Sequence, residues 1–297
     1  PFTSSISLSM ALGPNGTLLK LFHIQNFNIY GFKGTFIAET LTYFPVSYMV
    51  ISSILNTMSS SLDDAALSLG AENSRILRTV TLPLSMPAVA NSFLLLFGSS
   101  LADFATPLIL GSHTFPILPT QAYLQITGKF DINGGSALSL LLLVPALLVF
   151  FFQQFLIGKK NYVTVSGKSG HQSVFSPLPI TVKMICYTVS SIVLIFVIYL
   201  YYIILKGSLV KVWGINETIT FSHYSYVFKR GMKAITDTLK IACISTLVGG
   251  VLGVVIGYIV QRKNFALKRF LDFSSMLNYA LPGTVVGIAY IIAFNKK

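Results

Sequence analysis

Six long apolar stretches constrain the fold of this chain more than any other feature. Each contains roughly 20 to 26 mainly apolar residues, and a helix of that length crosses the ~30 Å hydrocarbon core of a bilayer. Apolar and polar residues do not alternate in these stretches, as they would in a barrel of spanning strands. We therefore expect an all-α integral membrane protein with about six spanning helices. The expected spans are Phe36–Leu55, Ala88–Leu110, Ser136–Ile157, Val182–Leu205, Ile235–Val260 and Phe270–Phe294.

The composition agrees with a membrane protein. Only 10% of the 297 residues are charged, against about 25% in soluble domains. The net charge of +12 would also suit a nucleic-acid-binding protein. In a membrane chain, however, Lys and Arg collect in cytoplasmic loops because they set the orientation. If residues 60–83 are cytoplasmic, ten Lys and Arg residues lie on that side and six on the other. We expect the lipid bilayer as a partner and no nucleic acid.

A short polar insert separates the first two expected spans. Two serines lie three residues before Asp63 and Asp64, the spacing of a capping box at a helix start. Gly70 permits the positive φ that turns a chain sharply at a helix end. A second short helix is expected over residues 71–80, and Pro83 closes it because proline has no backbone donor.

The spacing of this insert resembles the EAA loop of bacterial ABC importer permeases. An acid and two alanines are followed by a glycine four residues on, an aliphatic residue ten further on, and then Leu-Pro. The matching residues are Asp64, Ala65, Ala66, Gly70, Val80, Leu82 and Pro83. Asp64 replaces the family's glutamate, and Val80 replaces its isoleucine. The resemblance implies that the first four residues couple to an ATPase and that the last three shape the second helix. The alternative is an ordinary capped loop between spans.

Other segments resemble ferric-iron permeases with two fused halves. They are Leu101–Gly111, Tyr123–Ile126 with Gly128, Trp213-Gly214, Thr218–Tyr224 and Leu281–Gly287. Permeases for thiamine, polyamines, sulfate and phosphonates share related patterns, so these substrates remain open.

The resemblance also implies an organisation of the chain. Residues 1–157 are expected to be the C-terminal part of the first permease half, with the EAA-like loop at 60–83 and a turn-rich start over residues 1–35. Residues 158–181, rich in Gly, Ser and Pro, read as a cytoplasmic linker. Residues 182–297 are expected to be the N-terminal part of the second half, truncated before its own EAA loop.

Asp103 is an acid within an expected span, which makes it a functional candidate because burying a charge in a membrane is costly. A structural acid, capped by a neighbouring helix, is equally open. Pro107, Pro282 and Gly283 are further candidates for a translocation pathway, since proline supplies irregular backbone there.

Three glycines, Gly249, Gly253 and Gly257, lie four residues apart on one helix face. This pattern favours close helix packing, and a moving gate interface is the alternative.

Resident catalytic or metal sites are not expected. Gly167-Lys168-Ser169 resembles the end of a P-loop, but Tyr162 stands where its first glycine should be. The four histidines are too dispersed for a metal site. The chain is therefore expected to bind no cofactor, to hold no metal and not to be an enzyme.

The resemblance implies the transmembrane domain of a type I ABC importer in the bacterial cytoplasmic (inner) membrane. Its implied partners are cytoplasmic ABC ATPase subunits, which bind the ATP, and an extracytoplasmic substrate-binding protein. The implied substrate is ferric iron. Two alternatives are a secondary transporter driven by an ion gradient, with Asp103 as its ion site, and a non-transporting membrane scaffold.

Overall fold

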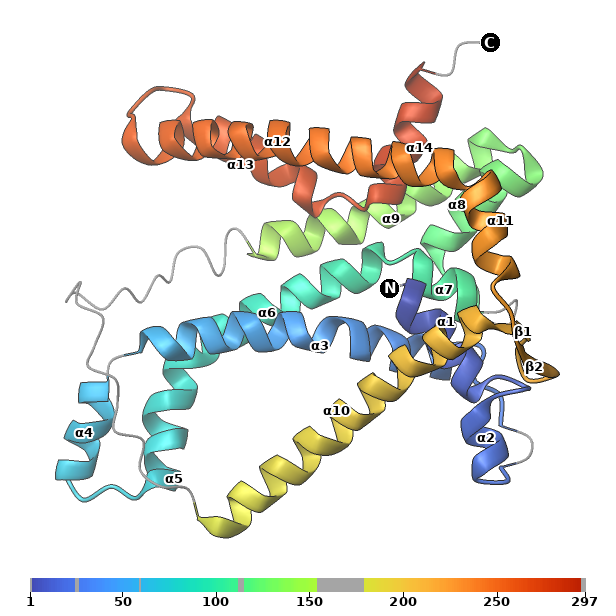
Figure 1. Cartoon of the computed structure of the whole chain (residues 1–297). Coiled ribbons are helices and arrows are strands. Elements are labelled where there is room, and N and C mark those ends of the chain that lie inside the picture. Colours follow the sequence, from blue (N-terminus) through green and yellow to red (C-terminus); the bar gives the residue numbers. More distant parts are fainter. Residues whose placement is uncertain (1, 25–26, 59, 112–114, 154–178, 295–297) are drawn as a thin grey trace. The chain divides into compact units, whose positions relative to one another are not determined.

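The computed structural model describes residues 2–24, 27–58, 60–111, 115–153 and 179–294. Nearly all of its regular structure is helical (Figure 1), as expected. The chain divides into two compact units. Unit 1 comprises Pro1–Ser5, Tyr30–Tyr199 and Pro282–Lys297, and unit 2 comprises Ile6–Ile29 and Leu200–Leu281. Most of the expected linker, up to residue 178, lies outside the described residues.

Unit 1 is built around two helix pairs. The long helices α3 and α6 pack against each other, and α8 packs against α9, with α14 resting on α9 and α8. The elements of this unit are α3 (Phe32–Thr57), α4 (Ser60–Ser68), α5 (Asn73–Ile76), the π-helical turn η1 (Leu77–Thr81), α6 (Leu82–Ala102), α7 (Ala105–Leu110), α8 (Leu118–Lys129), α9 (Ile132–Phe152), the first part of α10 (Ile180–Leu209) and α14 (Gly283–Phe294).

Unit 2 joins the start of the chain to a hairpin that the sequence did not predict. The hairpin is formed by β1 (Val210–Val212) and β2 (Asn216–Ile219), which pair antiparallel. Gly214 has a φ of 72° in the turn, a conformation that glycine adopts without steric cost. Trp213 Nε1 donates to Met10 O at 3.1 Å, and Lys20 Nζ donates to Gly214 O at 2.9 Å.

The rest of unit 2 is helical. Its helices are α1 (Phe2–Leu12, the first residues of which belong to unit 1), α2 (Thr17–Leu21), α11 (Ser222–Arg230), α12 (Met232–Arg262) and α13 (Lys268–Ala280). The expectation of a turn-rich start was therefore incomplete, because two helices flank the turn at residues 13–16. A Cβ at Gly16 would overlap Ala11 O, so this turn requires glycine.

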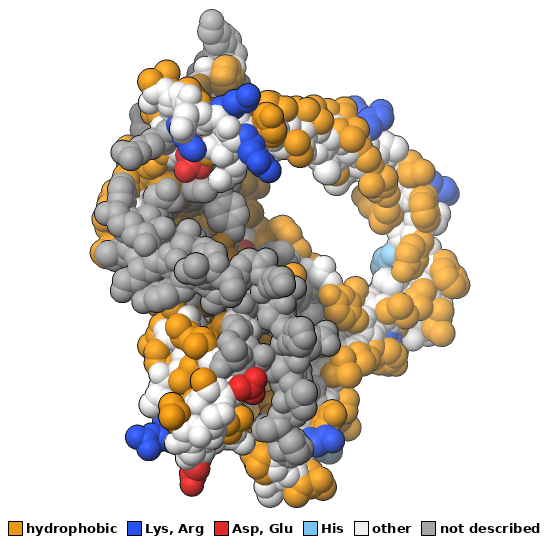
Figure 2. Space-filling view, turned by 90° about the vertical axis from the view of Figure 1, so that its left-hand side faces the viewer, with side chains coloured by type: hydrophobic (Ala, Val, Ile, Leu, Met, Phe, Trp, Pro, Cys, Tyr) orange, Lys and Arg blue, Asp and Glu red, His pale blue; other side chains and the backbone are white. Residues whose placement is uncertain are grey.

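Four helical segments in the described ranges are long and apolar enough to cross a membrane. They are Asn73–Ala102, Ile132–Phe152, Ile180–Leu209 and Met232–Arg262. Only 6% of the most apolar stretch of α12 is buried within the structure. Figure 2 shows hydrophobic side chains over much of the described surface of one face, with few charges. Such surfaces suit lipid as a solvent.

Two of the six expected spans, Phe36–Leu55 and Phe270–Phe294, are not among these four segments. Helix α3 covers Phe36–Leu55 but falls below the apolarity of the other four. The sixth expected span, Phe270–Phe294, is wrong as one helix, because it divides into α13 and α14. Leu281 takes an extended conformation (ψ 127°), which a following proline favours. Pro282 therefore interrupts the helix, leaving an apolar α14 of 12 residues.

The second expected span is also shorter at its C-terminal end. We expected a helix to Leu110, but α6 ends at Ala102 and Asp103 has an extended ψ of 122°. At the other end the helical path begins earlier, at Asn73. Asp103 thus lies at a helix break rather than inside a span.

Candidate functional site

The loop between α4 and α5 has a defined backbone geometry. Helix α4 ends in a Schellman motif, in which Ala71 N donates to Ala66 O at 3.0 Å and Gly70 N donates to Leu67 O at 2.9 Å. Gly70 has a φ of 78°, so the predicted positive φ is confirmed. A Cβ at Gly70 would meet no atom within 4 Å. The turn is therefore open to solvent or to a partner.

The sequence predicted that Pro83 ends the second helix of the loop, and this prediction is wrong. It lies in the first turn of α6, after η1. A π-helical turn widens the helix by one residue, and a proline in the first turn needs no backbone donor. Helices α5 and α6 consequently continue through η1 as one path. Val80 is half-buried in η1, whereas Leu82 and Pro83 are exposed at the start of α6.

The surface of the loop is more apolar than its acidic motif suggests. Asp64 and Ala65 are exposed, and Ala66 is half-buried. Exposed leucines lie before and after them in the sequence, and Leu69, next to the turn, is 89% exposed. These leucines are Leu62, Leu67, Leu69 and Leu77. Sequence reasoning missed them, although an apolar residue in a polar loop was a readable signal. The expected capping serines, Ser60 and Ser61, have side chains outside the described residues.

The second group of interest lies where α6 ends. Asp103 is 6% exposed, and its Oδ1 atom accepts hydrogen bonds from Ala105 N (2.9 Å) and Thr106 N (3.3 Å). These bonds favour the structural interpretation of Asp103, since the carboxylate caps the turn into α7. Its Oδ2 atom is buried and has no hydrogen-bond partner within the described part of the chain. Only one of the two carboxylate oxygens of Asp103 therefore takes part in the hydrogen bonds that cap this turn.

Helix α3 brings further polar side chains to this region. Ser100 Oγ donates a hydrogen bond to Glu39 Oε2, and Tyr43 OH donates to Ser99 O at 3.3 Å. Asp103 N donates to Ser100 O at 3.1 Å, so Glu39, Tyr43 and Asp103 all contact Ser99 or Ser100 at the end of α6. The sequence analysis missed Glu39, although it is an acid in an expected span, as Asp103 was. The same criterion would have found it.

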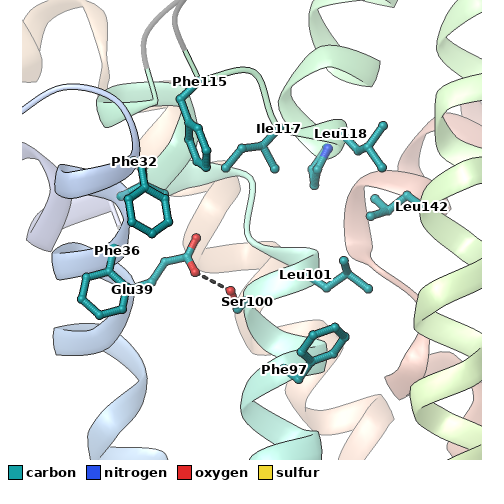
Figure 3. A pocket seen from close by; sticks show the side chains of 12 residues that line it. Phe32, Phe36, Glu39, Phe97, Ser100, Leu101, Phe115, Ile117, Leu118 and Leu142 are labelled. Carbon is teal, nitrogen blue, oxygen red and sulfur yellow. Dashed lines mark hydrogen bonds between the residues drawn. The ribbon is translucent and has the colours of Figure 1, made fainter.

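A cavity of about 370 Å³ opens beside Glu39. Figure 3 shows the Glu39 side chain reaching from α3 toward Ser100 on α6, with phenylalanines from three segments around it. Phe32 contacts Phe115 edge to face, with ring centroids 5.5 Å apart. The walls are mainly apolar, and Glu39 is the one charged residue among those that line the cavity.

The other predicted residues lie elsewhere. Pro107 is buried in α7, which packs on α3, whereas Pro282 is buried just before α14, which packs on α8 and α9. Gly283 begins α14. The glycine face of α12 is exposed, and a Cβ at any of Gly249, Gly253 or Gly257 would meet nothing within 4 Å. Their packing role stays a prediction. No group of three His, Cys, Asp or Glu residues that could hold a metal occurs in the described ranges.

These features define a class of membrane protein. The sequence profile of the family described as "Binding-protein-dependent transport system inner membrane component" matches residues 5–162. The chain belongs to this family, and it is an inner membrane component without catalytic activity of its own. The two remaining alternatives, a secondary transporter and a scaffold, are no longer supported.

Two ferric transport permeases match essentially the whole chain, and a polyamine permease matches about half of it. The chain is 36% identical over 306 residues to the "Ferric transport system permease protein FbpB" of Actinobacillus pleuropneumoniae, covering 99% of this chain and 44% of that protein. It is 37% identical to the "Putative ferric transport system permease protein FbpB 1" of Haemophilus influenzae, covering 100% and 48%. A "Spermidine/putrescine transport system permease protein PotC" of H. influenzae is 31% identical over 49% of this chain and 56% of its own length.

The chain spans about half the length of the two ferric relatives. No solved structure matches it.

Proposed function

We propose that the chain is part of the transmembrane subunit of an ATP-driven importer for ferric iron. The observation that carries this proposal is its identity of 36–37% to two ferric transport permeases over essentially its whole length. The polyamine relative matches only about half of the chain. The ferric permeases therefore match more of the chain than the polyamine permease does, and this favours ferric iron as the substrate.

We further propose that the loop between α4 and α5 docks on a cytoplasmic ATPase subunit. Asp64, Ala65, Ala66 and Gly70 would form the contact, and Val80, Leu82 and Pro83 would join it to α6. The exposed leucines support this role, because an apolar surface rimmed by polar residues suits a protein partner. ATP would bind to the partner, and an extracytoplasmic binding protein would deliver the iron.

The organisation into two halves follows from the same reasoning. The family profile ends at residue 162, close to the start of the proposed linker at residue 158. Residues 1–157 would then be the C-terminal part of the first half, and residues 182–297 the N-terminal part of the second. The proposed pathway residues Asp103 and Pro107 belong to the first half, and Pro282 and Gly283 to the second.

Uptake of radioactive ferric iron into proteoliposomes tests the proposal. The full-length parent protein, its ATPase and its binding protein would be reconstituted together. Gly70→Trp is expected to reduce ATP-dependent uptake to background while membrane insertion is unchanged. A Cβ at Gly70 meets no atom of this chain within 4 Å, so the tryptophan has room to project toward the partner. Because the φ of 78° strains any side chain, a control must separate that strain from the bulk.

Gly70→Asn is the matched control. Asparagine tolerates the left-handed backbone that this position requires and adds little bulk, so uptake should be largely retained. Normal uptake by Gly70→Trp would refute the docking surface. ATP hydrolysis stimulated by a different solute, without iron uptake, would keep the importer and reject iron as its substrate.

A further inference from the structure

Two carboxylates approach each other where α3 meets the end of α6. Glu39 projects from α3 and accepts a hydrogen bond from Ser100. Asp103 follows the end of α6, and its N atom donates to Ser100 O at 3.1 Å, so both acids contact the same serine. Tyr43 OH donates to the neighbouring Ser99 O at 3.3 Å. Two acids therefore share one small region of the membrane domain, together with a phenol and a serine hydroxyl.

In the described part of the chain, neither carboxylate forms an ion pair with a basic side chain, and the ion pair found there joins Lys206 to Glu217 in unit 2. A buried carboxylate without a counter-charge is costly, and two carboxylates close together repel each other. The arrangement thus favours the binding of a cation.

Oxygen atoms suited to a cation remain available. Asp103 Oδ2 and Thr106 Oγ1 are both buried without a hydrogen-bond partner in the described part of the chain. Asp103 is 6% exposed and Thr106 is fully buried. A buried polar atom without a partner is uncommon in native structures, and a ligand would supply what it lacks. Carboxylate and hydroxyl oxygens are hard ligands, which bind hard cations.

A cavity gives an approach to Glu39 and Ser100, which line it, while Asp103 and Thr106 are not among its lining residues. Its volume of about 370 Å³ extends from Phe115 and Ile117, before α8, to Ser100 on α6. Figure 3 shows Glu39 on the wall of the cavity, so an ion entering it would meet this carboxylate.

We propose that Glu39 and Asp103 form a transient binding site for a hard multivalent metal cation, with Tyr43 and Thr106 as neighbouring oxygen donors. The assignment of that cation as the transported ion rests on the function proposed above. Within the described ranges, no third His, Cys, Asp or Glu residue joins these two carboxylates. We therefore expect binding weak enough for release, which conduction requires.

Terbium luminescence tests the site directly. Tb³⁺ is a hard trivalent cation whose emission is sensitised by a nearby phenol. The purified full-length protein in lipid nanodiscs would be titrated with Tb³⁺. Glu39→Gln and Asp103→Asn are each expected to weaken binding by about ten-fold or more, since each removes a charged ligand. Tyr43→Phe should lower the emission more than it lowers the affinity.

These variants preserve the native hydrogen bonds. Asn at position 103 can still accept from Ala105 N and Thr106 N, and Gln at position 39 can still accept from Ser100. Asp237→Asn, which changes an exposed acid on α12, is the matched control and should bind Tb³⁺ as the unchanged protein does. Unaltered Tb³⁺ affinity in both carboxylate variants would overturn the site.

The uptake assay then separates the two proposals. Iron uptake reduced by Glu39→Gln and Asp103→Asn, with ATP hydrolysis retained, would support a site on the transport pathway. Unreduced uptake in variants that have lost Tb³⁺ binding would overturn that placement. If the unchanged protein transports no iron, the proposed substrate fails, while the terbium titration still decides whether the cation site exists.

Discussion

Asp131 shows how a single carboxylate can join two helices. It is the N-cap of α9, where its Oδ1 atom accepts from Gly134 N at 2.9 Å. Its Oδ2 atom accepts from Gln125 Nε2, on α8, at 2.8 Å. These hydrogen bonds, the Gly134 bond most of all, lower the pKa of the Asp131 carboxyl below its usual value. The charged form is thus the one that the connection between α8 and α9 requires.

The lowered pKa of Asp131 predicts a pH-dependent stability. Its contribution is fully present above the pKa of the unfolded chain, about 4, and is lost as the pH falls through the lower folded value. Asp131→Asn keeps a good N-cap but removes the charge. The melting temperature of the unchanged protein should therefore exceed that of the variant at pH 7, and the difference should shrink below about pH 4. A difference that stays constant from pH 7 to pH 3 would contradict this role.

Individual residues were predictable where local backbone rules apply. The positive φ of Gly70 followed from its place after a short helix, because glycine ends helices in this way. Asp103 was singled out by its charge alone, and the same reasoning should have included Glu39. The sequence could not predict that Asp103 and Glu39 lie close together, because this depends on how α3 packs against α6.

Among the helices, the α8–α9 contact depends on one small residue. Gly135 is buried near the start of α9. A Cβ at this position would overlap the side chain of Ile126 and lie 3.1 Å from Ala122 O. The two helices approach so closely there that only glycine fits.

Gly135→Ala is expected to destabilise unit 1 by about 1–3 kcal/mol, because overpacking a close contact forces side chains or backbone to shift. Shortening the opposing side chain with Ile126→Val should recover part of the loss, measured by thermal unfolding in detergent. Gly98→Ala is the control, since a Cβ at Gly98 in α6 meets nothing within 4 Å. Equal effects of the two glycine changes would contradict the role of close packing.

The helices were predicted better than their ends. The lengths of the apolar stretches located the helical spans within the described residues. They also led us to extend one span across Asp103 and another across Pro282. Both errors have the same cause, because apolar composition continues through a break that only backbone hydrogen bonding reveals. The π-helical turn η1 was equally hidden, since proline usually indicates a helix end.

For the whole chain, orientation is the property that the sequence addresses most directly. The greater number of basic residues on the side of residues 60–83 favours a cytoplasmic loop. The basic residues near α11, including Lys229 and Arg230, reduce this bias. The side of each loop stays a prediction that requires a direct test.

Cysteine labelling provides that test. Ser68→Cys, in α4, and Ser225→Cys, in α11, both place a thiol at an exposed position. In whole cells with a permeable outer membrane, a membrane-impermeant maleimide should label the cysteine at 225 and not the one at 68. The native Cys186 and Cys243 would first be replaced by serine. Labelling at 68 before cell lysis would reverse the proposed orientation.

The continuity from the loop into α6 has a mechanical consequence. Asn73–Ala102 forms one helical path of 30 residues, which is about 45 Å long. One end of this rod lies at the proposed ATPase contact, and the other ends at Asp103. A push on the loop would not be absorbed by a flexible linker. It would tilt the rod and move the carboxylate at its far end relative to Glu39. A stroke at the loop would thus become a change of ion affinity about 45 Å away.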